Sequence, residues 1–138
     1  MEDLYCKIYV DTDMSQNQFL DFIAKTINGY IELRTVFHPF FEIDVVNNQD
    51  ASPLQAISYV DGFLYYPYYL DIEPLDNIKR EAYIASIAML LMTLWDIGSK
   101  AVAACDFENE LPKQTARANT QVCPYKIYDY RGEPACSP

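Results

Sequence analysis

The sequence predicts an α+β fold, and three observations support this class. Two segments sixty residues apart, LYCKIYVD at Leu4–Asp11 and LYYPYYLD at Leu64–Asp71, are identical at four of eight positions. Each is followed by a segment whose apolar residues recur at helical spacing, and further short alternating segments lie after these. A strand–helix–strand unit that occurs twice, with one extra strand, predicts a ferredoxin-like two-layer sandwich whose helices cover one face of a single sheet.

The first predicted unit begins with a strand and a helix. Leu4–Val10 alternates between apolar and polar residues, which is typical of a half-buried strand. Ser15 with Gln18 three residues later forms a capping box, so a helix should begin there. Gly29 is expected to end that helix in a left-handed conformation.

Two strands are predicted after this helix. They cover Tyr30–Val36 and Phe41–Val46, and the His38-Pro39 dipeptide makes a turn between them. In the second strand, apolar residues alternate with Glu42 and Asp44, which predicts one buried and one solvated face.

The second half repeats this layout after a polar loop. Asn47–Gly62 is predicted as that loop, and a strand is expected from about Phe63 to the Glu73-Pro74 dipeptide. A long helix at Asp76–Ile97, closed by a glycine, and a last strand at Ala101–Phe107 complete the domain. Pro67 conflicts with this assignment, because a proline inside a central strand removes a hydrogen bond of the sheet.

The charge of the chain restricts its partners. The formal net charge is −10 and the pI is about 4.3, so binding to nucleic acid or to an anionic membrane through the general surface is disfavoured. Residues 1–112 are expected to form one domain, and residues 113–138 a tail that can pack back on it. The acidic N-terminus lacks a secretory signal pattern, which favours a cytoplasmic protein with reduced thiols.

The uncovered face of the predicted sheet is rich in tyrosine. Tyr5 and Tyr9 of the first repeat share one face, and Tyr65 and Tyr69 of the second are expected beside them. A tyrosine ring packs while its hydroxyl stays solvated, which suits a half-wet surface. A contiguous aromatic face rimmed by acids indicates a protein interface, although tyrosine is also common in strands for packing reasons alone.

Acidic residues near strand ends suggest two further features. Asp106, Glu108 and Glu110 share parity, so an extended backbone would align their carboxylates to attract a basic partner. A second group consists of carboxylates that follow the two repeated strands, at Asp11, Asp13, Asp71 and Glu73. That group could hold Mg²⁺ or Ca²⁺, but favourable interaction with helix N-termini explains it more simply, and no metal or cofactor is expected.

Residues for catalysis are sparse. His38 is the single histidine and precedes a proline, which is typical of a turn residue rather than a general base. Cys105 is expected in the core without a histidine partner, and four cysteines without a CxxC pair disfavour a zinc site. Four glycines leave no phosphate-binding loop. The chain is therefore expected not to be an enzyme.

The segment AACDFENELP at Ala103–Pro112, together with the LYY…LD strand, resembles the immunity proteins of bacterial polymorphic toxin systems. The resemblance extends to the general layout of residues 4–112, a small acidic α+β protein, and excludes the later tail. It implies a non-enzymatic protein that neutralises a cognate toxin domain by binding it, as a monomer or homodimer, with no catalytic residues.

The expected contacts to such a basic toxin domain are Tyr65, Tyr69, Asp71, Asp106, Glu108 and Glu110. Two alternatives stay open at this point. One is a small-molecule or metal-binding ferredoxin-like domain or enzyme that uses the open sheet face or the carboxylates after the two repeated strands. A closed pocket lined by Tyr66, Tyr68 and the helices would favour it. The other is a homo-oligomeric structural protein that pairs through the apolar second helix or through the tyrosine face.

Overall fold

The computed structural model describes residues 3–76 and 78–114. Six strands form one sheet in the order β2-β3-β4-β5-β1-β6, in which all neighbours are antiparallel. The strands are β1 (Cys6–Asp11), β2 (Tyr30–Glu32), β3 (Thr35–Phe37), β4 (Phe41–Asn47), β5 (Tyr68–Pro74) and β6 (Lys100–Cys105). The helices are α1 (Gln16–Ile27), α2 (Pro53–Ser58) and α3 (Arg80–Asp96), with 3₁₀ turns η1 (Gly62–Tyr65) and η2 (Glu108–Glu110). The α+β class is confirmed.

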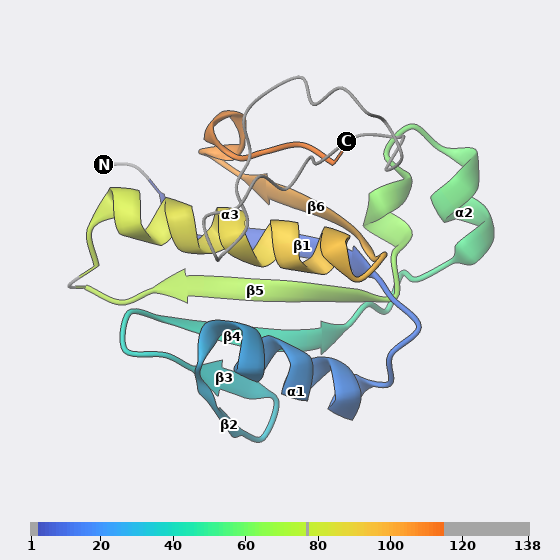
Figure 1. Ribbon diagram of the computed structural model, residues 1–138. Coiled ribbons are helices and arrows are strands. Elements are labelled where there is room, and N and C mark those ends of the chain that lie inside the picture. Colours follow the sequence, from blue (N-terminus) through green and yellow to red (C-terminus); the bar gives the residue numbers. More distant parts are fainter. Residues whose placement is uncertain (1–2, 77, 115–138) are drawn as a thin grey trace.

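Helices α1 and α3 lie on one face of the sheet, and α2 with η1 lies at one end of it (Figure 1). The repeated segments supply β1 and β5, which are adjacent and lie in the middle of the sheet between β4 and β6. Their central position, which the sequence predicts, is therefore confirmed. No helix in the described part of the chain has the length and apolar character needed to cross a membrane.

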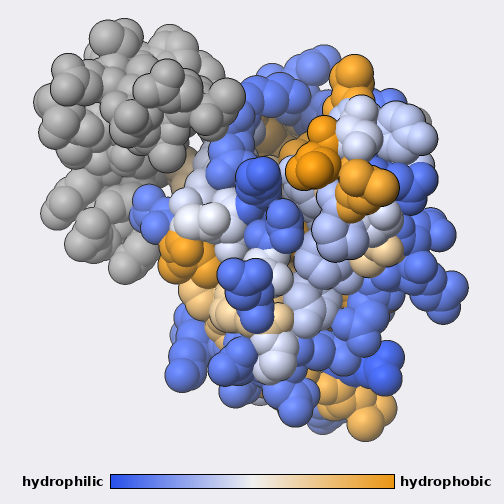
Figure 2. Space-filling model, turned by 90° about the vertical axis from the view of Figure 1, so that its right-hand side faces the viewer, coloured by the Kyte–Doolittle hydropathy of each residue, from blue (hydrophilic) through white to orange (hydrophobic). Residues whose placement is uncertain are grey.

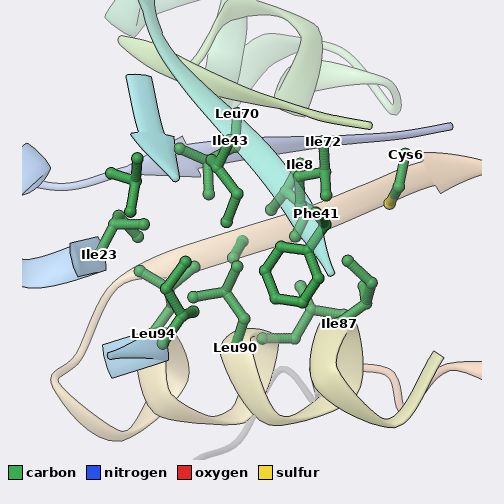
Figure 3. Close-up of a cluster of buried hydrophobic side chains, with 14 of the residues drawn as sticks. Cys6, Ile8, Ile23, Phe41, Ile43, Leu70, Ile72, Ile87, Leu90 and Leu94 are labelled. Carbon is green, nitrogen blue, oxygen red and sulfur yellow. The ribbon is translucent and has the colours of Figure 1, made fainter. Parts of the chain in front are cut away.

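The core fills the space between the sheet and the two long helices (Figure 3). Ile8, Leu70 and Ile43 come from three adjacent strands and are fully buried beneath the helices. Helix α3 is apolar around most of its surface, and its buried residues are Tyr83, Ile84, Ile87, Leu90, Leu91 and Leu94. Alternation along the strands leaves the polar and tyrosine side chains on the opposite face.

Helix α1 begins as predicted and ends differently. Ser15 and Gln18 form the reciprocal capping box. The left-handed residue at the C-terminus is Asn28, with φ of 58°, so the assignment to Gly29 is wrong. Gly29 has a different role, because a Cβ atom there would lie 2.5 Å from the carbonyl oxygen of Phe37. A side chain at this position would force α1 away from β3.

Three predicted segments are wrong for local reasons, and the helix predicted to start at Asp76 starts at Arg80. Residues 30–36 do not form one strand, because Leu33 has φ of 58° and turns the chain into the β2–β3 hairpin. Residues 47–62 are not all loop, because Ser52 caps α2 and Pro53 starts it. The chain before Pro67 forms η1 rather than a strand, and β5 begins at Tyr68, so this proline costs no hydrogen bond of the sheet.

The last described residues contact the sheet edge. The side chain of Gln114 accepts a hydrogen bond from the backbone N–H of Ala101 and donates one to the carbonyl of Ser99. These bonds satisfy two backbone groups at the start of β6, on the side that faces away from β1. The rest of the predicted tail, including Cys123 and Cys136, lies outside the described residues.

Candidate functional site

The sheet face that α1 and α3 leave uncovered, called here the open face, carries an unusual arrangement of charge. Glu42 of β4 stands directly opposite Glu73 of β5, and Asp44 stands opposite Asp71. We call these four residues the carboxylate quartet. Directly opposed side chains in antiparallel strands have Cβ atoms about 4.5–5.5 Å apart, and like charges at that separation destabilise the sheet. The fold therefore tolerates repulsion at the centre of its open face.

Hydroxyl groups position two members of the quartet. Thr35 on β3 donates a hydrogen bond from Oγ1 to the Asp44 carboxylate at 2.5 Å. The hydroxyl of Tyr5 donates one to the Asp71 carboxylate. Both donors are neutral, so they orient the carboxylates without compensating their charge. Lys7 on β1 stands directly opposite Asp71 and offsets one of the four charges, so the quartet together with Lys7 keeps a net negative charge.

Tyrosines lie beside the quartet. Tyr9 and Tyr69 are opposite one another on β1 and β5, and their ring centroids are 5.8 Å apart. The ammonium of Lys7 lies 4.4 Å from the centroid of the Tyr69 ring, a cation–π contact. Tyr9 also meets Phe63 of η1 edge-to-face, at a centroid distance of 5.4 Å. The aromatic surface continues from the sheet onto η1.

A hollow of about 450 Å³ lies where this aromatic surface meets the loop after β4. Tyr9, Tyr69 and Lys7 line it from the sheet. Tyr65 lines it from η1, and Asp50 from the loop after β4. Tyr65 therefore joins Tyr69 at one surface, as predicted, but it does so from η1 and not from a strand.

Apolar side chains project from the α2 end of the molecule. Leu54, Ile57 and Val60 are 71%, 79% and 103% exposed, and α2 buries none of its residues. We call these three residues the apolar ridge. Figure 2, which views the molecule from the α2 side, shows a group of apolar residues on this surface. An exposed apolar group of this kind marks an interaction site more often than chance.

Side-chain hydrogen bonds and close packing fix the segment that carries the ridge. The Asn48 side-chain amide donates hydrogen bonds to the carbonyls of Leu64 and Tyr66, and the Ser52 hydroxyl caps α2. At Gly62 a Cβ atom would lie 1.9 Å from the carbonyl oxygen of Ala56, so only glycine allows this close approach of η1 to α2. The ridge therefore lies on a segment, α2 with η1, whose backbone is held in place by packing.

The acidic row predicted at the end of the last strand does not form. The chain leaves β6 at Cys105 and turns into η2, so Asp106, Glu108 and Glu110 are not on an extended backbone. Glu110 forms an ion pair with Arg80 at the start of α3, with one N–O distance of 2.9 Å. Glu108 lines a hollow with Trp95 on the helix side of β6. The predicted contacts therefore divide between two faces, with Tyr65, Tyr69 and Asp71 on the open face.

The predicted alternative metal group is also dispersed. Because β1 and β5 are antiparallel, Asp71 lies opposite Lys7, whereas Asp11 lies at the other end of β1 opposite Lys100. Among residues 3–76 and 78–114, no group of three or more His, Cys, Asp or Glu side chains is arranged to hold a metal ion.

The predicted small-molecule pocket is not formed by Tyr66 and Tyr68 together. Tyr68 faces the core side, where its ring lies 5.1 Å from that of Phe19 and its hydroxyl donates to the Met14 carbonyl. Tyr66 lines the hollow near Trp95 instead.

The His38 ring stacks on the Phe41 ring at a centroid distance of 4.3 Å and accepts a hydrogen bond from the Phe40 N–H. Burial lowers the pKa of His38.

The open face is suited to binding positive charge beside aromatic and apolar surface. Asp44 and Glu73 are exposed, while Glu42 and Asp71 are half-buried, so a partner can reach all four carboxylates at the sheet surface. The sequence signal for Glu42 and Asp44 was their alternation with apolar residues, but their pairing with β5 depends on strand order.

No family model, no curated protein and no solved structure matches the chain.

Neutralising one opposed pair is expected to stabilise the fold. The Glu42→Gln/Glu73→Gln double variant removes a directly opposed like-charge pair and keeps the side-chain shapes. The free energy of unfolding should rise by about 0.5 kcal/mol at low salt, measured by urea denaturation. Asp13→Asn/Asp21→Asn, the same charge change at exposed positions outside β4 and β5, serves as the control. A decrease in stability for the first variant alone would show that the pair is not repulsive.

The Tyr5 hydroxyl predicts a pH effect on stability. Burial, the hydrogen bond to Asp71 and the charges of Asp71 and Glu73 all raise the pKa of Tyr5. Above the ordinary tyrosine pKa of about 10, the unfolded chain loses this proton while the folded chain keeps it, so stability falls as pH rises. Urea denaturation from about pH 9 to about pH 11 should show a smaller loss for Tyr5→Phe than for the parent chain. Equal losses would contradict the assignment.

Proposed function

We propose that this chain is a non-enzymatic binding protein whose open face docks a basic protein domain. The carboxylate quartet supplies negative charge for recognition, and Tyr9, Tyr65 and Tyr69 with the apolar ridge supply the area that is buried. The partner we propose is a bacterial toxin domain, which the chain neutralises as an immunity protein by covering its active surface.

The observation that carries this proposal is the direct opposition of like charges at the centre of the sheet. Glu42 with Glu73, and Asp44 with Asp71, each cost stability in the isolated protein. A partner that presents lysine or arginine side chains would convert this repulsion into attraction. Residues that destabilise the fold and make no compensating contact are expected at functional sites.

The same charges argue against a second copy as the occupant of the open face. A two-fold symmetric pairing brings a surface patch against its own copy, and here it would bring two quartets together. Like-charge contacts across an interface cost several kcal/mol, so such a dimer is strongly disfavoured. A basic partner is favoured by the same electrostatics.

The identity of the partner as a toxin rests on the resemblance of the AACDFENELP and LYY…LD segments and on charge. Many toxin domains that cut or modify nucleic acids are basic, because their substrates are polyanions. An acidic inhibitor gains association rate against such a domain and can occupy the groove that its substrate would use.

A neutralisation experiment tests the proposal. The C-terminal domain of a secreted protein encoded immediately upstream is expressed from an inducible promoter, with or without this chain in the same cells. We expect growth to stop without the chain and to continue with it, and a stoichiometric complex to form from the purified proteins. A toxic domain that the chain neither binds nor neutralises would contradict the proposal.

We also propose that β4, β5, β1 and β6 with α1 and α3 form a ferredoxin-like unit to which β2 and β3 are added at one edge. The support is the order β4-β5-β1-β6, with helices between the sequential strands on one side of the sheet. In such a unit the repeated strands are central neighbours and the opposite face is free for binding.

A further inference from the structure

Two cysteines face one another across the junction of the edge strand with the sheet. Cys6 on β1 is directly opposite Cys105 on β6, and both belong to or pack against the hydrophobic core. Directly opposed residues in antiparallel strands have Cα atoms about 4.5–5.5 Å apart, which lies inside the range of about 4.4–6.8 Å found for disulfides. The backbone therefore already has a spacing compatible with a bond between the two sulfur atoms.

The two thiols differ in access. Cys6 is fully buried, and its sulfur points from the sheet toward the helix layer (Figure 3). Cys105 is partly exposed at the end of the edge strand. Cys105 is therefore the more accessible of the two residues to a reagent in solution.

The thiols also differ in acidity. Hydrogen bonding with Cys6 and with the backbone at Phe107 lowers the pKa of Cys105. The same pairing and the burial of its sulfur raise the pKa of Cys6. Since the thiolate is the nucleophile, Cys105 is the sulfur that attacks first.

We propose that Cys105 and Cys6 form a thiol–disulfide exchange site for low-molecular-weight disulfides, with Cys105 as the attacking thiol and Cys6 as the resolving thiol. The site is independent of the open face, since both sulfur atoms lie on the helix side of the sheet. Neither sulfur is needed for binding a basic partner.

The reaction balances in two steps. The Cys105 thiolate attacks one sulfur of the small disulfide, which forms a mixed disulfide on Cys105 and releases one small thiolate. The Cys6 sulfur, after losing its proton to solvent, then attacks the Cys105 sulfur and expels the second small thiolate, which takes up a proton. The two protein thiols are oxidised to one disulfide, and the small disulfide is reduced to two thiols.

The product joins the edge strand to the centre of the sheet. A bond between residues 6 and 105 closes a loop that contains β2 to β5 and both long helices. Cross-links that close long loops stabilise by restricting the unfolded chain. The oxidised protein should therefore melt at a temperature higher by at least about 5 °C than the reduced protein.

Oxidised glutathione is the probe that tests this site. The parent for the test is the full chain with Cys123→Ser and Cys136→Ser, so that Cys6 and Cys105 are its two cysteines. After incubation at neutral pH, we expect a protein two hydrogen atoms lighter, with no retained glutathione and a Cys6–Cys105 linked peptide after digestion. A stable glutathione adduct on Cys105 with no internal link would overturn the resolving role of Cys6.

Two single variants separate the roles. In the same background, Cys6→Ala should trap one glutathione on Cys105, because the resolving sulfur is gone. Cys105→Ser should react at least about tenfold more slowly than Cys6→Ala, because the remaining sulfur is buried. Equal rates for the two variants would show that the reaction proceeds through an opened chain, and would contradict the assigned order. Circular dichroism confirms that each variant is folded before the comparison.

Discussion

Neutralising the whole carboxylate quartet is expected to lower the association rate constant for the proposed partner, a basic toxin domain, about a hundredfold at low ionic strength. The variant is Glu42→Gln/Asp44→Asn/Asp71→Asn/Glu73→Gln. Its four substitutions remove the charges that would steer a basic partner to the open face, while the side-chain shapes stay the same. Stopped-flow or surface-based kinetics measure the effect.

The salt dependence and a matched control make this result specific. Exposed charges are screened within about 8–10 Å at physiological ionic strength, so the difference between parent and variant should shrink as salt is added. The control Asp13→Asn/Asp21→Asn/Glu81→Gln/Asp96→Asn removes the same charge from exposed positions outside the open face. If both variants lost the same factor in association rate constant, the quartet would act only through its contribution to the net charge. That result would contradict a defined binding site.

The largest effect on stability is expected at the centre of the helix–sheet interface. Leu94 of α3 is fully buried in the core. Leu94→Ala should lower the free energy of unfolding by about 3 kcal/mol, because the lost burial is joined by an unfilled cavity. Urea denaturation measures this change.

Leu54→Ala on the apolar ridge is the matched control for that substitution. The chemical change is identical, but Leu54 is 71% exposed and outside the core, so its effect on stability should stay within about 0.5 kcal/mol. A similar loss at both positions would mean that the ridge is structural rather than a surface available to a partner. A loss at Leu94 alone leaves the ridge free for binding.

The central strands could be predicted from sequence because local signals and tertiary context agree there. Alternation in β1, the Ser15–Gln18 capping box and the left-handed Gly98 after α3 each act within a few residues. The repeat at offset sixty placed the two most similar segments together as neighbours.

The misplaced elements depend on backbone conformation and packing that the pattern of apolar residues does not show. Leu33 has an exposed side chain and a positive φ, a conformation that leucine does not signal. The segment LYYP has strand-forming residues, yet hydrogen bonds from Asn48 and the fit of Gly62 against Ala56 hold it as η1. Such constraints cannot be seen in a local pattern.

Only part of the candidate site could be predicted from the sequence, because the rest depends on which strands pair. Tyr69 and Asp71 follow from the parity of β5, but Glu42 and Asp44 join them only through the pairing of β4 with β5. The prediction of an acidic row was wrong for Asp106, Glu108 and Glu110. Alternate residues share a side only while the backbone is extended, and the chain turns into η2 before these residues could form such a row.

Mapping the contact surface on the chain shows whether the open face is the binding site. An isotope-labelled sample of the chain is titrated with the unlabelled domain proposed as its toxin partner, and changes in backbone amide chemical shifts are recorded for each residue. We expect the changes to concentrate on β4, β5, β1 and the apolar ridge, and to weaken together in the quartet variant. Changes concentrated on α1 and α3, with β4 and β5 unaffected, would contradict it.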